Sequence, residues 1–327
     1  MVPGVSVEEQ LCDISEKAQF AMFLDILTPK PGNVHRYKDH PDTRFIHFVA
    51  SINNLGYPLH QSAKWGYEFS TVENTPSRIG ELIRLAVQAS MEPHGKNTLL
   101  GTILLLVPLT AAAGHEIPRP QSTKPTLQES LKRILAYTSV EDAIELVHAL
   151  QAASPGGAIP KTAEWKSRSQ AFDFQSPHTI QLIRREKYSL CDLQALAASY
   201  DDIAHEYTTN FAYTFDTLYP QVTKALNQHP RTEDAVLASY LWALSDRPDS
   251  FIQRKKGATV AQDVMQRAKK VYARIMKLPE TSWASQTGSF DEYLRSQGSQ
   301  LNPGTTADLL SAALFIALFL GNIKSIL

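Results

Sequence analysis

Residues Ser189 to Leu218 read SLCDLQALAASYDDIAHEYTTNFAYTFDTL, and this stretch decides the fold class. Its apolar residues recur every three or four positions, at Leu193, Leu196, Tyr200, Ile203, Tyr207, Phe211, Phe215 and Leu218. That spacing places them on one face of a helix with about 3.6 residues per turn and fits a strand poorly. We therefore predict one long amphipathic helix from Ser189 to Leu218.

Helical signals also dominate the rest of the chain. Ser6-x-x-Glu9 is a capping box, in which the serine caps the helix and the glutamate reaches back to it. Similar starts occur at Thr126, Ser139 and Ser189. Alternating strand patterns are scarce, so we predict an all-α fold, a single domain of roughly 12 helices over residues 1–327. Residues 154–176, rich in Gly, Ser and Lys, are predicted to form a lid or a surface loop.

The composition is that of an ordinary soluble globular protein, with 43% hydrophobic and 20% charged residues. Its 32 basic and 33 acidic residues leave a net charge of -1, without the basic surplus of a nucleic-acid binder. The longest apolar run, Leu309 to Leu320, falls short of the roughly 20 residues that a membrane span needs. The N-terminus shows no signal peptide, so we expect a cytoplasmic protein without nucleic-acid or membrane partners.

Four polar segments interrupt the helical pattern, and the first is Thr28-Pro-Lys-Pro-Gly-Asn-Val-His35. Two prolines and Gly32 stiffen this turn, so Lys30 and Asn33 would be held for a ligand with little entropy left to lose. The alternative is a helix stop followed by a turn, with Lys30 in solvent.

The second segment, His94-Gly-Lys-Asn-Thr-Leu-Leu-Gly101, leads into an apolar helix. Gly95 loosens the loop, and Asn97 or Thr98 is placed to cap the helix. Helix N-termini present free backbone N–H groups, which suit phosphate. The spacing of a P-loop is absent. The alternative is an ordinary capped core helix.

The third segment lies within the predicted long helix. Asp202, Glu206 and Asn210 are spaced i, i+4, i+8 and would share one face beside the apolar stripe. Carboxylates at the edge of a core can hold hydrated Mg²⁺ or act as a base. We predict Asp202, Glu206 and Asp249 as metal ligands, with a solvated helix face as the alternative.

The fourth feature is a pair of segments, Asp249 to Gly257 and Asn302 to Asp308. Basic side chains before a glycine could clamp a phosphate chain, and the Pro-Gly turn would let a ligand approach the backbone closely. The predicted phosphate-binding residues here are Arg254, Lys255, Asn302, Gly304 and Thr305. Asp308 is predicted to bind metal or ribose. The alternative role of Asp308 is capping, because Thr305-x-x-Asp308 is itself a capping box.

Taken in order, these segments resemble the triphosphoribosyl-dephospho-CoA synthase family, which makes the prosthetic-group precursor of citrate lyase and malonate decarboxylase. The matching elements are Leu27-Thr-Pro-Lys-Pro-Gly-Asn-Val34, Gly95-Lys-Asn-Thr-Leu-Leu-Gly101, His205-Glu206, Pro248-Asp-Ser-x-Ile-x-Arg-Lys-x-Gly257 and Leu301-Asn-Pro-Gly-Thr-Thr-Ala-Asp-Leu-Leu310. The resemblance is closest to the divergent branch of archaea and methylotrophs. Citrate-lyase members typically have His-Lys-Gly where this chain has Leu99-Leu-Gly101, and Ser-Pro-Gly-Gly-Ser where it has Asn302-Pro-Gly-Thr-Thr306.

The resemblance implies glycosyl transfer, in which a ribose hydroxyl of 3′-dephospho-CoA attacks C1′ of ATP and adenine leaves. Mg²⁺ with Lys30, Arg254 and Lys255 would neutralise the triphosphate. We predict that Glu206 is the base and that Asp202 or Asp308 stabilises the positive charge developing at C1′. In the same mechanism, Asn33 and Asn97 would fix the ribose or the adenine edge.

Three alternatives stay open. The departures from the citrate-lyase pattern allow a related (phospho)ribosyl transfer to another acceptor, as in building a one-carbon carrier of the tetrahydromethanopterin type. An ATP-dependent phosphotransferase would release ADP and no adenine. A non-enzymatic, nucleotide-binding helical protein is the third. A homodimer is compatible with the sequence, which does not give the oligomeric state.

Overall fold

The computed structural model describes residues 5–119, 121–154 and 173–323, and over these residues the fold is all-helical without strands. The helices are α1 (Val7–Leu27), α2 (Phe45–Asn54), α3 (Gly56–Thr71), α4 (Ile79–Met91), α5 (Leu100–Glu116), α6 (Lys124–Ala136), α7 (Val140–Ala153), α9 (Thr179–Glu186), α10 (Leu190–Ala197), α11 (Asp202–Thr209), α12 (Tyr219–Gln228), α13 (Thr232–Asp246), α14 (Ser250–Lys256), α15 (Ala258–Ile275), α16 (Trp283–Arg295) and α17 (Gly304–Phe319). A π-helical segment, η1 (Tyr213–Leu218), and a 3-10 turn, η2 (Glu280–Ser282), complete them. The predicted fold class is confirmed, with more helices than the roughly 12 expected from periodicity.

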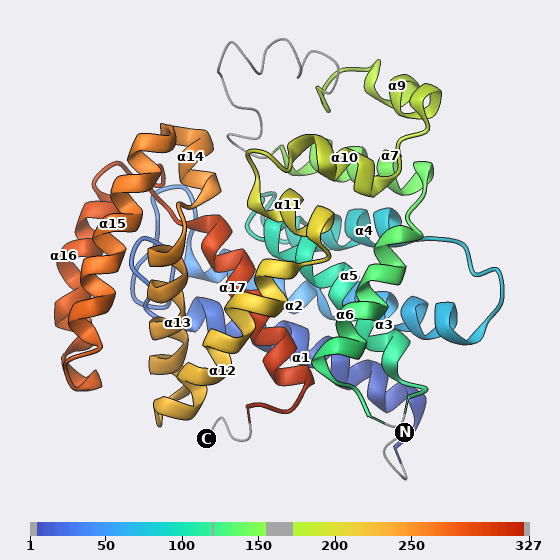
Figure 1. Ribbon diagram of the computed structural model, residues 1–327. Coiled ribbons are helices and arrows are strands. Elements are labelled where there is room, and N and C mark those ends of the chain that lie inside the picture. The colour runs from blue at the N-terminus through green and yellow to red at the C-terminus, as the bar shows by residue number, and fades with distance from the viewer. Residues whose placement is uncertain (1–4, 120, 155–172, 324–327) are drawn as a thin grey trace.

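Two helices, α5 and α17, form the centre of the molecule (Figure 1). Both are apolar on every side and almost entirely buried, as a helix must be when it has no polar face to offer to water. They pack against each other and against α1, while α3 crosses α5 on its other side. The predicted core helix over Leu309 to Leu320 is therefore confirmed as the body of α17.

The remaining helices surround this centre in three groups (Figure 1). Helices α12 to α16 cover one side, α4 and α6 the other, and α7, α9 and α10 form a layer above the N-terminal ends of α5 and α17. The predicted caps Ser6, Ser139 and Ser189 each accept a hydrogen bond from the third helical residue. The start predicted at Thr126 is wrong, because Thr123 caps α6 one turn earlier.

The single helix predicted from Ser189 to Leu218 is also wrong. The chain forms α10, α11 and η1, with turns at residues 198–201 and at Asn210 and Phe211. Asn210 and Phe211 both have positive φ, of 54° and 57°. Asparagine tolerates this conformation, and the complete burial of Phe211 offsets its backbone cost. The apolar spacing concealed the breaks because it continues at helical intervals across them, although the stripe is buried in the core only from Ile203 onwards and Leu196 of α10 is exposed.

Within the described residues, no helix is both long enough and apolar enough to cross a membrane. Most of the segment predicted as a lid or surface loop, residues 155–172, lies outside the described part of the chain. The candidate functional region is the space between the layer of α7, α9 and α10 and the ends of α5, α14 and α17.

Candidate active site

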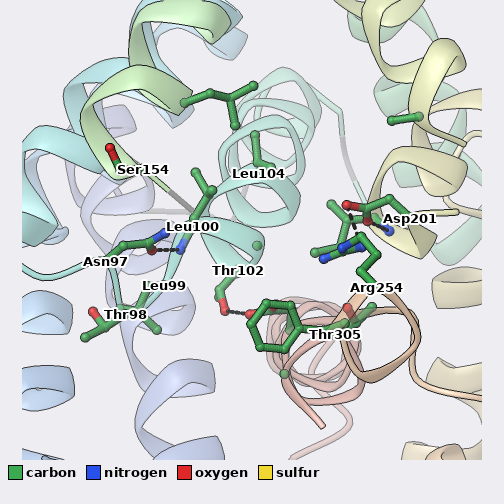
Figure 2. Close-up of a pocket in the computed structure, with 18 of the residues that line it drawn as sticks. Asn97, Thr98, Leu99, Leu100, Thr102, Leu104, Ser154, Asp201, Arg254 and Thr305 are labelled. Atoms are coloured by element: carbon green, nitrogen blue, oxygen red, sulfur yellow. Dashed lines mark hydrogen bonds and ion pairs between the residues drawn. The ribbon is translucent and has the colours of Figure 1, made fainter. Parts of the chain in front are cut away.

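A cavity of about 1460 Å³ lies between the upper helical layer and the N-terminal ends of the two central helices. Its lower wall comes from the loop after α1, the segment leading into α5, the helix α14 and the segment leading into α17. In Figure 2, Asn97 and Thr98 lie across from Arg254 and Asp201, with Thr102 and Thr305 between them. The first, second and fourth of the features singled out from the sequence therefore meet in space, although more than 200 residues separate the first from the last.

The N-termini of α5 and α17 both open into this cavity, and neither has a side-chain cap at its N-cap residue. Asn97 accepts a hydrogen bond from the backbone N–H of Leu100 at 3.2 Å, so the predicted capping role of Asn97 is confirmed in part. Free N–H groups and the positive end of each helix dipole favour anions. In α17 the N–H of Thr306 is already bonded to the carboxylate of Asp249, so a phosphate group would use other N–H groups of the two first turns. With that limit, the two ends beside one cavity make its lower wall suitable for phosphate groups.

Asp308 of α17 connects the two helix ends through a hydrogen bond to α5. Its Oδ1 accepts a hydrogen bond from the Thr102 hydroxyl of α5 at 2.5 Å, and its carboxyl lines the cavity. It does not cap α17, because that helix begins at Gly304, one residue before Thr305. Gly101 makes this approach possible, since a Cβ at that position would stand 2.1 Å from Asp308 Oδ2.

The pKa of the Asp308 carboxyl lies well above the usual value for an aspartate. Burial is the main cause and raises its pKa to about 7, and the carboxylate of Asp25 adds to this shift. The hydroxyl of Thr102 and the ammonium of Lys30 offset it only in part. A carboxyl with such a pKa, on the wall of a cavity, can both take up and release a proton near pH 7.

A buried ion pair between Lys30 and Asp25 lies under the cavity. The Lys30 side chain is fully buried, and its ammonium stands 5.2 Å from the centre of the Tyr240 ring. Burial lowers the pKa of Lys30 and raises that of Asp25, and their mutual attraction opposes both shifts. Asp25 lines the cavity but Lys30 does not, so Lys30 supports the site from below and does not reach into it.

The loop after α1 is anchored from α16. Asp291 accepts a hydrogen bond from the Gly32 N–H at 2.9 Å, and Arg295 bonds both Asp291 and the Asn33 carbonyl. Gly32 has φ +80°, and a Cβ there would meet Leu294 at 2.7 Å, so it serves close packing and does not line the cavity. These contacts hold Asn33 at the cavity wall.

Two buried polar atoms at the wall lack hydrogen-bond partners among the described residues. Asn33 donates to Asn302 Oδ1 at 2.6 Å, which leaves its own Oδ1 without a donor. Arg254 pairs with Asp201 at 2.8 Å through one terminal nitrogen, which leaves its Nε without an acceptor. Buried polar atoms are nearly always satisfied, so such atoms beside a cavity indicate where a ligand would supply the missing partner.

The structure brings most of the predicted ligand-binding residues together. The ten that line the cavity are Asn33, Gly95, Asn97, Thr98, Arg254, Lys255, Asn302, Gly304, Thr305 and Asp308. The five that do not are Lys30, Gly32, Asp202, Glu206 and Asp249. Sequence reasoning missed Asp25 as a wall residue. A signal was present, because Asp25 follows Ala21 and Met22 on the buried stripe of the first helix, where a carboxylate is out of place.

The carboxylates predicted to hold Mg²⁺ are already engaged elsewhere. Asp202 pairs with Arg247 at 2.8 Å. Glu206 accepts hydrogen bonds from the N–H groups of Tyr213 and Thr214, at 3.2 and 2.8 Å. Asp249 caps α14 and accepts from the N–H and hydroxyl of Thr306, both at 2.8 Å. Their oxygens do not converge within 4.8 Å of one another, so the three do not fit a joint site for one ion.

The fold and the cavity together define a class: an all-helical protein in which two helix N-termini, both basic and acidic side chains and a carboxyl with a pKa of about 7 surround one cavity. Comparison with known families makes this specific, because the family model described as CitG: ATP:dephospho-CoA triphosphoribosyl transferase matches residues 12–325. The chain therefore belongs to this transferase family.

A crystal structure from Archaeoglobus fulgidus, described provisionally as a triphosphoribosyl-dephospho-CoA synthase, has a similar fold. The TM-score is 0.59 with 22% sequence identity, over 84% of this chain and 99% of that one. No match was found among proteins of curated function.

Proposed function

We propose that this protein transfers the triphosphoribosyl group of ATP to a ribose hydroxyl of 3′-dephospho-CoA and releases adenine. The position of Asp308 carries the proposal, because its near-neutral carboxyl lines the cavity between two phosphate-favouring helix ends. Family membership supports the same reaction. The cavity also exceeds the ~300–1,000 Å³ typical of a pocket for one small ligand, as a reaction between two nucleotides requires.

In the proposed step, Asp308 takes the proton of the acceptor hydroxyl while the oxygen of that hydroxyl forms a bond to C1′ of ATP. The bond from C1′ to N9 of adenine breaks, and its electron pair leaves with the base. Adenine then needs one proton, which the protonated Asp308 can return because its pKa is about 7. The negative form of the carboxyl also stabilises the positive charge that develops at C1′ before the new bond forms.

The triphosphate would lie against the ends of α5 and α17, where Arg254 and Lys255 add positive charge. The unpartnered oxygen of Asn33 suits an N–H or hydroxyl donor of the ATP nucleoside. We propose that Mg²⁺ enters as the counter-ion of the triphosphate, and we derive no step through it. Asp308 replaces Glu206 as the proposed base, because Glu206 does not line the cavity.

The direct test is to incubate the protein with ATP, Mg²⁺ and dephospho-CoA and to separate the products by chromatography. We expect free adenine in amounts equal to the acceptor consumed, and no ADP. Release of ADP without adenine would instead identify a phosphotransferase. If adenine were released with a pterin acceptor and not with dephospho-CoA, the proposed acceptor would be wrong.

The Glu206→Gln variant is expected to lose stability without losing the reaction. Glutamine cannot accept from both N–H groups, of Tyr213 and Thr214, because one of its two side-chain groups is a donor. We expect the free energy of unfolding to fall by about 1–3 kcal/mol in urea titrations. Adenine release at a temperature where the variant is folded should stay close to the wild-type rate. A folded variant that has lost adenine release would restore Glu206 as the base.

A further inference from the structure

The cavity changes character from its lower to its upper end. Its lower end is formed by the helix N-termini, Asn33, Arg254 and Asp308. Its upper end is formed by α7, α9 and α10, whose contributions are mainly aliphatic: Leu146, Val147, Leu150, Leu182, Leu193 and Leu196. In Figure 2, Leu104 and Ser154 already lie above Thr102 and Thr305, towards this end. A ligand that fills the cavity must therefore be charged at one end and largely uncharged at the other.

The upper end offers little to a second set of phosphates. The charged residues that α7, α9 and α10 contribute to the lining are Arg185 and Glu186, which pair with each other at 2.7 Å and are largely exposed. Aliphatic side chains gain free energy by covering apolar atoms and lose it by desolvating charges. The upper end thus favours an uncharged chain.

We propose that the upper end binds the uncharged, flexible pantetheine arm of the acceptor, while the lower end holds ATP. This inference rests on the proposed function and adds to it where the acceptor lies and which part of it is recognised. The arm carries methyl and methylene groups interrupted by amides. Leucine side chains can cover the methyl and methylene groups, and Gln194, which lines the same end, can form hydrogen bonds with the amides.

The junction between the two ends matches the chemistry of such an acceptor. The cavity wall continues from Leu193 of α10 through residues 194–197 and 199–200 to Asp201, which pairs with Arg254. In dephospho-CoA a diphosphate joins the adenosine to the arm. Arg254 stands where the apolar wall meets the polar one, so its guanidinium, which also faces the proposed triphosphate site, can bond that diphosphate through the unpartnered Nε.

The test compares dephospho-CoA with ADP, which keeps the adenosine diphosphate and lacks the arm. We expect kcat/KM for ADP as acceptor to be lower by roughly 100-fold, since most of the apolar contact is lost. Calorimetric titration of each compound, with the ATP site first saturated by an ATP analogue that cannot transfer its ribose, should show the same preference. Equal kcat/KM and equal affinity for the two acceptors would overturn the inference.

Two matched variants locate the effect. Leu196 lines the upper end and is 42% exposed, and Leu278 is 38% exposed and lies outside the cavity. Both leucines are already in contact with water, so replacement by aspartate should leave the fold intact. We expect Leu196→Asp to weaken dephospho-CoA binding about tenfold, with ADP binding and the KM for ATP unchanged. Leu278→Asp should change none of these.

The outcomes separate the inference from the function on which it rests. Adenine release with wild-type preference for dephospho-CoA in Leu196→Asp would overturn the upper-end site and leave the proposed function standing. Absence of adenine release with every acceptor would overturn the proposed function. In that case the calorimetric comparison of dephospho-CoA with ADP still decides whether the arm is bound.

Discussion

Replacing Asp308 with asparagine is expected to lower the rate of adenine release by roughly 10²–10⁴-fold, the range typical of losing a general base. Asparagine has nearly the same shape and can still accept the Thr102 hydrogen bond, so the substrate site should keep its form. It cannot take the proton of the acceptor hydroxyl. Initial rates with saturating ATP and dephospho-CoA measure the effect, and a variant that keeps half the wild-type rate would rule Asp308 out as the base.

The dependence of kcat/KM on pH gives an independent measure of the pKa of Asp308. Since the base must be ionised, kcat/KM of the wild type should rise with pH and level off above about 7, the pKa of Asp308. Because folding raises this pKa, the ionised carboxyl costs stability, and that cost grows as pH increases from about 4 to about 7. Asp308→Asn removes the cost and should raise the Tm by a few degrees at pH 8 and little at pH 4.

A matched control for Asp308→Asn is Asp202→Asn. Asp202 was predicted from the sequence as a catalytic carboxylate, but it pairs with Arg247 and does not line the main cavity. The substitution keeps the size of the side chain and weakens only a partly exposed ion pair, worth roughly 1 kcal/mol or less. We expect near wild-type adenine release. Equal losses in the two variants would show that the assay reports loss of charge in general and not the base.

Replacing Lys30 with methionine is expected to have the largest effect on stability. It leaves the Asp25 carboxylate buried without its cation, and breaking a buried ion pair from one side costs roughly 3–5 kcal/mol. Burial already raises the pKa of Asp25, and without Lys30 that pKa rises further. The loss should therefore be largest above neutral pH and diminish in acid, where Asp25 takes up a proton. Urea unfolding at pH 8 and pH 5 measures it.

The double variant Lys30→Met with Asp25→Asn supplies the control. Removing both charges leaves no isolated ion in the core, so most of the lost stability should return. The double variant removes the Asp25 charge, which raises the pKa of Asp308, together with the Lys30 charge, which lowers it. The contribution of Asp25 is the larger of the two, so the pH profile of the double variant should shift slightly to lower pH. A single variant within about 1 kcal/mol of the wild type would show that Lys30 is not part of a buried pair.

Much of the fold follows from local sequence. The side chains of Ser6, Ser139 and Ser189 begin helices wherever they stand, because capping uses atoms only three residues away. The apolar run after Gly304 has no polar face, so it had to become a central helix. The polar segments at Asn33, Asn97 and Arg254 also stood out as breaks in the helical pattern, and all three line the cavity.

What the sequence could not decide is which carboxylate does the chemistry. Glu206 and Asp202 looked suited to it, yet Glu206 is taken up by the N–H groups of the next turn because the chain breaks at Asn210. Asp308 was predicted to bind metal or ribose or to stabilise the charge at C1′, with helix capping as the alternative, and the structure places it in the wall of the cavity. Its pKa depends on burial and on Asp25 and Lys30, which lie far away in sequence. Caps and apolar stripes are local properties of the chain, whereas the access and the pKa of a carboxyl arise only when distant segments pack around it.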